Sequence, residues 1–386
     1  MITATKIKLK PTKEQEVLFW KSAGVARWAY NYFLSESERY YRKYSKTIKE
    51  SDVRKHINNV LKKTSHIWLK EVGSNVMKQG VKDGNLARDR WFKGISDKPK
   101  FKSRRKSKPS FYVNYESFKK VKGGFRGEKI GFIRTYEALP KLKKGEKYSN
   151  PRISFDGKSW FLSIGYNVEV NPIELTDKSL GIDVGIYSLA VCSDGAFKKN
   201  INKSKRVKQL KCILKREKRK LSRKIEDNIS HYEKNRKPIY KTPLKDMKNI
   251  QKQNKVIRNL YKKLTDIRVN HLHQCTSEIV KTKPSKIVME TLNIKGMMKN
   301  KHLSKVISEQ CLYEFKRQIQ YKCKKYGIEF VEADKWFPSS KKCSCCGTIK
   351  KDLKLKDRIY KCSCGFKSDR DLNAAINLAN YSIQSA

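Results

Sequence analysis

The sequence predicts a mixed protein. Its C-terminal half is an α/β domain, and its N-terminal half combines a helical region with a small β domain. Three observations support this. Apolar strand-like runs at 180–185, 286–290 and 328–331 alternate with amphipathic helical segments. Short alternating runs bounded by turn residues fill 110–168. Aromatic-rich helical patterning extends over 11–93.

The N-terminal half begins with residues 5–10, where polar and apolar side chains alternate as in a strand. Thr12 then opens a helix, because Gln15 three places later completes a capping box. Helical patterning persists to about residue 93, with polar connectors. At 95–110 the pattern gives way to Lys, Arg, Ser and Pro.

The small β domain is predicted from short apolar runs at 110–113, 129–133 and 153–155. Asp156 and Gly157 form a tight hairpin signal that leads into a further strand at 159–168. The strand around Ile7 is a candidate for the same domain, which would make the intervening helices an insertion.

In the C-terminal half, residues 200–282 are basic and helical. Apolar side chains recur there at spacings of three, four and seven, which is typical of packed amphipathic helices. They are Leu210, Leu214, Leu221 and Ile225 on one helix, and Ile257, Leu260, Leu264, Ile267, Cys275 and Ile279 on a second. The lysines opposite fit a solvated helix surface and a face along a duplex equally well. A later helix ends at Gly327, and a last one runs from about Asp371 to Tyr381.

The net charge of the chain indicates which class of molecule it binds. The 386 residues contain 90 Lys+Arg against 37 Asp+Glu, a formal net charge of +53. A monomer with this charge repels itself unless a polyanion neutralises it, and nucleic acid is the natural candidate. A solubilising surface and an acidic membrane are the alternatives. No apolar run approaches the ~20 residues that span a bilayer, and no secretory signal is evident at the start, so we expect a cytoplasmic protein.

The cysteines predict a zinc site. Of the ten, five lie between residues 343 and 364. Cys343 and Cys346 form one knuckle, and Cys362 and Cys364 form a second, each followed by glycine. Two such knuckles fit a tetrahedral thiolate site for one structural zinc. The second knuckle has one spacer residue instead of two, so Cys345 is a possible substitute ligand. A redox role is the alternative.

Three acids predict a second metal site. Asp183 lies within an apolar strand, Glu290 ends another, and Asp369 and Asp371 stand where the last helix begins. Taken singly, each has a structural explanation: Asp183 in a turn, Glu290 at a strand end, Asp371 as a helix N-cap. Together they suggest three acids converging on one sheet edge, where they would ionise fully only around divalent cations such as Mg²⁺ or Mn²⁺. Two such ions could support phosphodiester hydrolysis.

The basic run that follows the helical region mixes Lys and Arg with an aromatic residue, which suits phosphate contact and base stacking. A solvated loop is the alternative. The candidate nucleic-acid contacts are Arg27, Lys100, Lys102, Arg104 and Arg105. Tyr30 and Tyr32 are further candidates by chemistry alone, although core packing explains them better.

Taken in order, four motifs resemble the insertion-sequence TnpB (OrfB) family, which is related to compact type V CRISPR effectors. They lie at 181–185 (GIDVG), 288–293 (VMETLN), 339–347 (SSKKCSCCG) and 369–375 (DRDLNAA), and segments 6–34 and 99–111 are also similar. Two features depart from the family pattern: Thr291 stands where many relatives have another acid, and the second knuckle is shortened.

The resemblance implies a fold in four parts. It implies an RNase H-like (RuvC) nuclease domain with an inserted zinc ribbon, an oligonucleotide-binding-like wedge barrel and a helical recognition insertion. The implied bounds are 1–10 and 110–172 for the barrel, 11–109 for the helical domain, 173–342 and 365–386 for the nuclease domain, and 343–364 for the ribbon. The three catalytic acids would be Asp183, Glu290 and Asp371, with Asp371 preferred to Asp369 because it matches the family acid two places before the asparagine.

The resemblance also implies an activity. Family members bind a guide RNA derived from the transposon end, recognise a short motif beside the target, and cut both strands of double-stranded DNA with one active site. It further implies a prokaryotic, nucleoid-associated protein. A guided repressor that does not cut and a transposase-like strand transferase are the alternatives. Guide, motif, cut positions and oligomeric state do not follow from the sequence.

Overall fold

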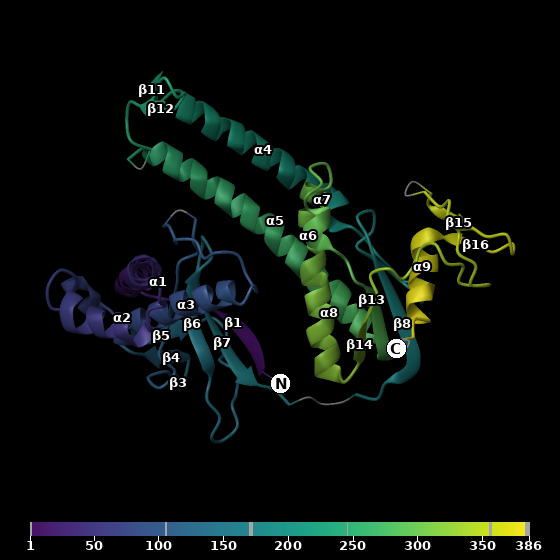
Figure 1. Ribbon diagram of the computed structural model, residues 1–386, viewed down its shortest axis with the longest axis horizontal. Helices are drawn as coiled ribbons and strands as arrows, with labels where there is room; N and C mark the ends of the chain where they lie inside the picture. The colour runs from purple at the N-terminus through teal and green to yellow at the C-terminus, as the bar shows by residue number, and fades with distance from the viewer. Residues whose placement is uncertain (1, 105, 170–172, 245, 355–356, 383–386) are drawn as a thin grey trace. The chain divides into compact units, whose positions relative to one another are not determined.

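The chain divides into two compact units, Met1–Glu169 and Val170–Ala386, and each is described by itself. The computed structural model (Figure 1) describes residues 2–104, 106–169, 173–244, 246–354 and 357–382.

The first unit contains a seven-stranded antiparallel sheet in the order β2-β6-β7-β1-β5-β4-β3. Its strands are β1 (Ile2–Lys10), β2 (Ser110–Tyr112), β3 (Lys119–Val121), β4 (Gly124–Gly127), β5 (Gly131–Thr135), β6 (Ser149–Phe155) and β7 (Trp160–Asn167). β1 pairs with β7 over most of its length and with β5 at Leu9 and Lys10. In the described part of the chain no ladder joins β2 to β3, so closure into a barrel stays a prediction.

The helices of the first unit lie between β1 and β2. They are α1 (Lys13–Tyr44), α2 (Glu50–His56), a π-helical turn (Ile57–Leu61), a 3-10 turn (Ile67–Glu71) and α3 (Ser74–Phe92). The capping box of α1 is present: the Gln15 amide N–H donates to Thr12 Oγ1 (3.3 Å), and the Thr12 N–H donates to Gln15 Oε1 (3.0 Å).

Helices and sheet of this unit share one hydrophobic core. Phe19 of α1 packs against Trp160 of β7, with ring centroids 5.1 Å apart, and against Phe111 of β2 at 5.6 Å. Tyr30 is also buried in this core, as expected. The helical region is therefore packed on the sheet, and the predicted boundaries between barrel and helical domain stay predictions.

The second unit is built on a five-stranded sheet in the order β10-β9-β8-β13-β14. Its strands are β8 (Thr176–Val184), β9 (Ala190–Cys192), β10 (Phe197–Lys198), β13 (Pro284–Glu290) and β14 (Glu329–Ala333). β13 runs parallel to both β8 and β14, whereas β9 and β10 are antiparallel additions to the β8 edge. Strands that alternate with helices thus form the α/β half that the sequence predicts.

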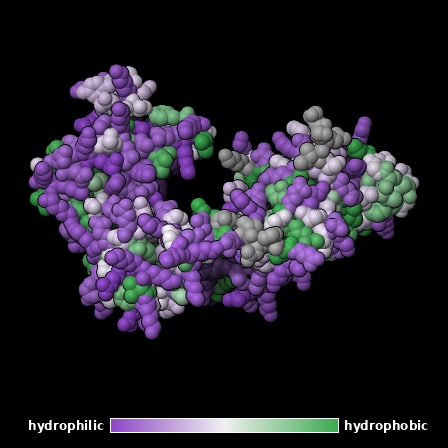
Figure 2. All heavy atoms as spheres, turned by 90° about the horizontal axis from the view of Figure 1, so that it is seen from below, coloured by the Kyte–Doolittle hydropathy of each residue, from purple (hydrophilic) through white to green (hydrophobic). Residues whose placement is uncertain are grey.

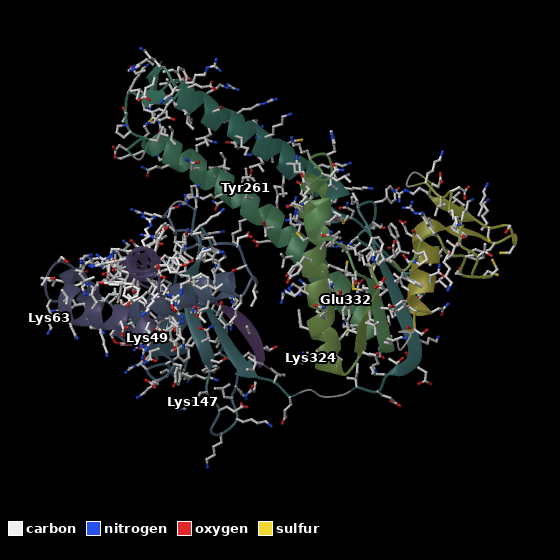
Figure 3. The ribbon with its side chains drawn as sticks, in the orientation of Figure 1. Lys49, Lys63, Lys147, Tyr261, Lys324 and Glu332 are labelled. Carbon is white, nitrogen blue, oxygen red and sulfur yellow. The ribbon has the colours of Figure 1, made fainter. Side chains whose placement is uncertain are left out.

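Two long helices, α4 (Lys205–Glu226) and α5 (Lys248–Lys281), follow the 3-10 turn Ile201–Lys203 and form a hairpin (Figure 1). Most of the predicted apolar positions meet here, with Leu214 of α4 packed in one cluster with Leu260 and Leu264 of α5. A basic side chain also contacts an aromatic ring across the hairpin. The Lys218 ammonium of α4 lies 5.4 Å from the ring centre of Tyr261 of α5, which is labelled in Figure 3. The sequence pattern did not predict the small β-hairpin at the tip, which consists of β11 (Ile229–Tyr232) and β12 (Pro238–Tyr240).

The remaining elements are α6 (Ile294–Met297), α7 (Ser304–Gln310), α8 (Leu312–Tyr326), β15 (Ile359–Lys361), β16 (Lys367–Asp369) and α9 (Arg370–Ala379). α5 and α8 cover one face of the five-stranded sheet, where Ile182 and Met289 join their core. α9 covers the other face, where Leu378 packs against Val288. α8 ends at Gly327 in the left-handed conformation (φ 74°), as predicted.

The visible surface is mostly hydrophilic, with scattered hydrophobic patches (Figure 2), in keeping with the excess of basic residues. Within the described residues, no helix combines the length and apolarity needed to cross a membrane.

Candidate functional site

The last helix is capped by Asp369, not by Asp371. The Asp369 carboxylate accepts the backbone N–H groups of Asp371 (2.9 Å) and Leu372 (3.1 Å), as an N-cap does. The N-cap explanation of Asp371 is therefore wrong. Asp371 lies in the first turn of α9 with only 16% of its side chain exposed, so its carboxylate is left for another role.

Gly181 sets how closely α9 approaches the sheet. A Cβ at this position would lie 2.0 Å from the Ala375 carbonyl oxygen and 2.4 Å from the Ala379 amide nitrogen. The helix backbone thus rests directly on β8, which is possible only because glycine has no side chain. Asp371 precedes Ala375 by four residues, about one helical turn, and so projects from the same side of α9.

Strand periodicity places the other two acids on this face. Asp183 follows Gly181 by two residues in β8 and faces the same side of the sheet. In the parallel register Gly181 pairs with Val288 and Ile182 with Met289, so Asp183 and Glu290 are the next neighbours. Asp183 also pairs with Val191 of β9, so it lies in a strand and not in a turn. The structure therefore gathers Asp183, Glu290 and Asp371 on the α9 face of the sheet.

The carboxyl groups influence one another electrostatically. Burial raises the pKa of Asp183 well above its ordinary value, and the negative charges of Asp371 and Glu290 raise it further. Burial also raises the pKa of Glu290. Such a group of acids is stable in its ionised form only with added positive charge, which makes its chemistry suitable for divalent cations with hard oxygen ligands.

Two arginines, which sequence reasoning missed, supply part of this positive charge. Arg358 Nη1 lies 3.6 Å from one Asp371 oxygen, and Arg370 Nη2 lies 3.6 Å from the other. The Arg358 guanidinium also lies 5.3 Å from the ring centre of Tyr187. Arg370 stands within the quoted family motif, but nothing in the sequence pattern marks Arg358, which comes from the segment between the two knuckles.

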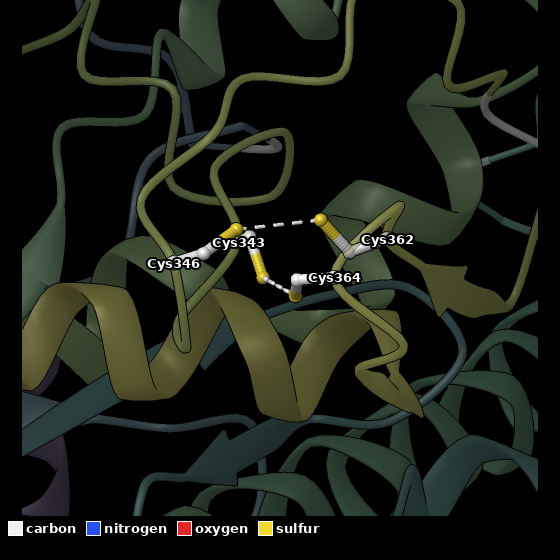
Figure 4. Close-up of side chains that lie close together, drawn as sticks. All are labelled: Cys343, Cys346, Cys362 and Cys364. Atoms are coloured by element: carbon white, nitrogen blue, oxygen red, sulfur yellow. Dashed lines mark hydrogen bonds between the residues drawn. The ribbon is translucent and has the colours of Figure 1, made fainter.

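The four cysteines form a tighter group than the acids. The sulfur atoms of Cys343, Cys346, Cys362 and Cys364 all lie within 4.8 Å of one another; no other set of His, Cys, Asp or Glu ligand atoms in the described chain does so. Two of the sulfur pairs are 3.8 Å and 3.5 Å apart (Figure 4). A tetrahedral zinc with Zn–S bonds of about 2.3 Å requires sulfurs about 3.8 Å apart. The cluster can therefore bind one structural zinc ion.

The two knuckles are shaped by glycines and a buried tyrosine. Gly347 and Gly365 follow the cysteines with φ of 78° and 87°, the left-handed conformation in which a side chain would be strained. Tyr360 of β15 is fully buried and donates its hydroxyl to the Lys341 carbonyl at 3.1 Å. Cys345 is exposed and outside the sulfur cluster, so the shortened second knuckle needs no substitute ligand.

Helix α9 joins the cysteine cluster to the acids. Asn373 is completely buried; its side chain donates to the Lys342 carbonyl (2.7 Å) and accepts the Ser344 N–H (3.0 Å). Asn377, one turn later, donates to the carbonyls of Ser339 (2.8 Å) and Lys342 (2.6 Å). The helix that carries Asp371 therefore also holds the backbone beside Cys343 in place.

The predicted nucleic-acid contacts differ in accessibility. Lys100 and Arg104 are exposed, and Arg27 is partly buried in a depression that it shares with Lys102. The Lys102 ammonium lies 3.8 Å from the ring centre of Tyr30, and its backbone is held by the Asn31 side chain through two 2.8 Å hydrogen bonds. Burial lowers the pKa of Lys102, and its contact with nucleic acid stays a prediction. Arg105 lies outside the described residues.

Three family models match the chain. A model described as a helix-turn-helix domain of OrfB from the IS605 group matches residues 1–46, and one described as a probable transposase of that group matches 163–301. A third, the Cas12f1-like TNB domain, matches 313–378 and includes the cysteine cluster. In this chain the first segment forms strand β1 and the single long helix α1.

Relatives match the chain along nearly its whole length. A protein of Streptomyces pristinaespiralis, named "Putative RNA-guided DNA endonuclease", is 28% identical over 97% of this chain and 88% of its own. A protein of Escherichia coli K12, given the same description and the name InsQ, is 26% identical over 98% and 91%.

The fold has a solved counterpart. The chain of a Cas12f1-sgRNA-target DNA complex matches with a TM-score of 0.57 at 14% identity, covering 98% of this chain and 99% of that one. This likeness concerns the fold alone. The family models and the relatives that match nearly the whole chain lead to one conclusion: the chain belongs to the TnpB (OrfB) family of insertion sequences.

Proposed function

We propose that this protein is an RNA-guided endonuclease that recognises a short motif beside its DNA target and hydrolyses phosphodiester bonds in both strands. The gathering of Asp183, Glu290 and Asp371 on one face of a mixed sheet carries the hydrolytic part of the proposal. The names of the relatives and the excess of basic residues support a guide RNA and double-stranded DNA as partners.

The three acids would hold two Mg²⁺ or Mn²⁺ ions in a nuclease domain of the RNase H-like (RuvC) type. The ions would supply charge stabilisation for the attacking and leaving oxygens. The Asp183 carboxyl, held in a rigid strand, would fix the position of the site, and Asp371 would complete it from α9. Arg358 and Arg370, each 3.6 Å from an Asp371 oxygen, place positive charge beside this carboxylate.

The remaining parts of the chain would serve the nucleic acids. We propose a wedge-type barrel at 1–10 and 110–172 and a recognition insertion at 11–109 that contact the guide and target. The zinc ribbon at 343–364 would be a structural part of the nuclease domain at 173–342 and 365–386. Zinc in the ribbon would fix the base of α9 through Asn373.

The test is cleavage of a target plasmid by the purified protein–RNA complex with Mg²⁺. The wild type should give linear product, and Asp183→Asn should lower the rate by about two to three orders of magnitude, since losing one group that stabilises transition-state charge costs on that scale. Asp177→Asn is the matched control, because Asp177 is an exposed acid of the same strand and should leave cleavage unchanged.

The alternatives give different products. Tight target binding with intact plasmid in both wild type and variant would indicate a guided repressor, and a joined product carrying new DNA would indicate a strand transferase. Equal cleavage by wild type and Asp183→Asn would remove the assignment of this site.

A further inference from the structure

A groove in the first unit has no part in the site described above. It lies between the second half of α1, the end of α3 and the segment 98–101, and its cavity volume is about 630 Å³. Four aromatic side chains in its lining are exposed to an unusual degree: Tyr41 by 55%, Trp91 by 36%, Phe92 by 55% and Phe101 by 58%. Large aromatic side chains gathered in one exposed concave surface indicate a binding site more often than chance exposure.

A buried arginine forms hydrogen bonds across the floor of the groove. Arg88 is buried there, with its guanidinium 5.0 Å from the ring centre of Phe33. It donates to Ser37 Oγ (3.1 Å), to the Ile48 carbonyl (3.0 Å) and to Asn85 Oδ1 (2.6 Å). These hydrogen bonds and the Asp89 carboxylate at 3.3 Å offset the desolvation cost of the buried cation, and they tie together the backbone beneath the aromatic side chains.

The rim is positively charged. One acid, Glu38, faces the cations Arg42 (3.1 Å) and Lys98 (3.6 Å), and Lys100 adds a further exposed charge. Lys98 lies 5.7 Å from the ring centre of Trp91, and Trp91 stacks on Phe92 with centroids 4.9 Å apart. An apolar protein segment would gain nothing from this excess of positive charge. A planar ring that carries a phosphate would use both parts of the groove.

We propose that this groove binds one unstacked base of a single-stranded nucleic acid, with the base against Phe101, Trp91 and Phe92 and its flanking phosphate on the lysines of the rim. Aromatic side chains beside cations are the usual means of holding such a base, whatever its identity. The inference rests on the proposed function, because that function makes nucleic acid the partner. It adds a specific subsite and the state of the strand that enters it.

The test uses the full-length protein and single-stranded probes of about 16 nucleotides, one DNA and one RNA, each with a central 2-aminopurine. Stacking quenches the fluorescence of this base. We expect the wild type to quench it and Phe101→Ala to lose the quenching, with binding weakened roughly 5- to 150-fold, as for the loss of one stacked base. Phe101→Tyr should restore both, and a duplex probe, whose base is already stacked, should not respond.

The matched control is Tyr313→Ala, which removes an exposed aromatic side chain (69%) of α8, outside the two parts of the chain proposed to contact the nucleic acids. It should bind and quench as the wild type does. A response confined to one probe identifies RNA or DNA as the source of the base.

Quenching and affinity unchanged in Phe101→Ala would overturn the inference, and intact plasmid cleavage by that variant would leave the proposed function standing. Failure of the wild type to bind either strand would count against both.

Discussion

At the scale of single residues, position relative to the backbone decides which of two neighbouring acids is structural. Asp369 accepts two N–H groups at the start of α9, whereas Asp371 faces the other acids and two arginines. The family motif favoured Asp371 as the catalytic acid, and the hydrogen bonds of Asp369 give that neighbouring acid a structural role in this chain.

Substitutions of the two acids should therefore have different effects on cleavage and stability. Asp371→Asn should abolish plasmid cleavage with little change in unfolding temperature. Asp369→Ala should reduce stability by about 0.5–2 kcal/mol, the usual effect of losing an N-cap, and leave measurable cleavage. Paired thermal unfolding and cleavage assays test this, and the reverse pattern would transfer the metal site to Asp369.

The two lysines of the basic run should also differ. Lys100 is exposed, whereas Lys102 lies over Tyr30. If Lys100 contacts phosphate, Lys100→Met should reduce the salt dependence of nucleic-acid affinity by about one in the log–log slope, and Lys102→Met should leave the slope unchanged. Affinity measured at several salt concentrations decides between them. Equal slopes in Lys100→Met and wild type would show that Lys100 does not contact phosphate and belongs to a solvated loop.

At the scale of elements, α9 connects the three acids to the cysteine cluster. Its backbone rests on Gly181 of β8, its first turn carries Asp371, and its buried Asn373 and Asn377 hold the segment before Cys343. Displacement of this helix should thus affect both groups at once.

Gly181→Ala tests the contact between α9 and β8. The added methyl group would lie 2.0 Å from a carbonyl oxygen, so the helix must shift. We expect a loss of stability of at least about 1–3 kcal/mol, as in overpacked cores, and loss of cleavage because Asp371 moves with the helix. Gly24→Ala is the control. Its Cβ meets nothing within 4 Å in α1, and it should stabilise by about 0.5–1 kcal/mol. Full activity of Gly181→Ala would show that α9 need not touch β8.

Zinc content tests the ribbon. Cys362→Ser should bind no zinc and unfold at a lower temperature, because a structural zinc contributes its binding energy to folding. Cys345→Ser should retain one zinc per chain, since Cys345 lies outside the sulfur cluster. Metal analysis of both variants, with thermal unfolding, measures this. Normal stability of Cys362→Ser without zinc would contradict a structural role.

At the scale of the whole molecule, the net charge of +53 is the dominant property. Like charges this numerous raise the free energy of any compact state, and the cost falls when a polyanion binds or salt screens them.

Thermal unfolding should therefore respond to polyanions. At constant ionic strength, a nucleic acid present at about 100 times its Kd should stabilise the protein by about 2.7 kcal/mol. Added KCl should raise the unfolding temperature of the free protein by screening repulsion, and should reduce the effect of the nucleic acid. A neutral osmolyte does not screen charge, so it should not reduce the stabilisation by the nucleic acid as KCl does. An unfolding temperature that falls with KCl would show that repulsion does not limit stability.

The sequence by itself determined the local features of this protein. The capping box at Thr12, the hairpin at Gly157, the apolar faces of α4 and α5 and the two glycine-terminated knuckles follow from short-range chemistry, so they could be predicted from residue type and spacing. The family motifs supplied the choice of acids, which composition alone did not.

Only the tertiary structure decided how distant segments meet. The register of β8 against β13 brings Asp183 beside Glu290, the close approach of α9 to Gly181 adds Asp371, and the fold delivers Arg358 to that carboxylate. These contacts join positions separated by up to nearly two hundred residues. They depend on packing of whole faces, which no local pattern encodes. The same reason explains why the aromatic groove of α1 and α3 became visible only in three dimensions.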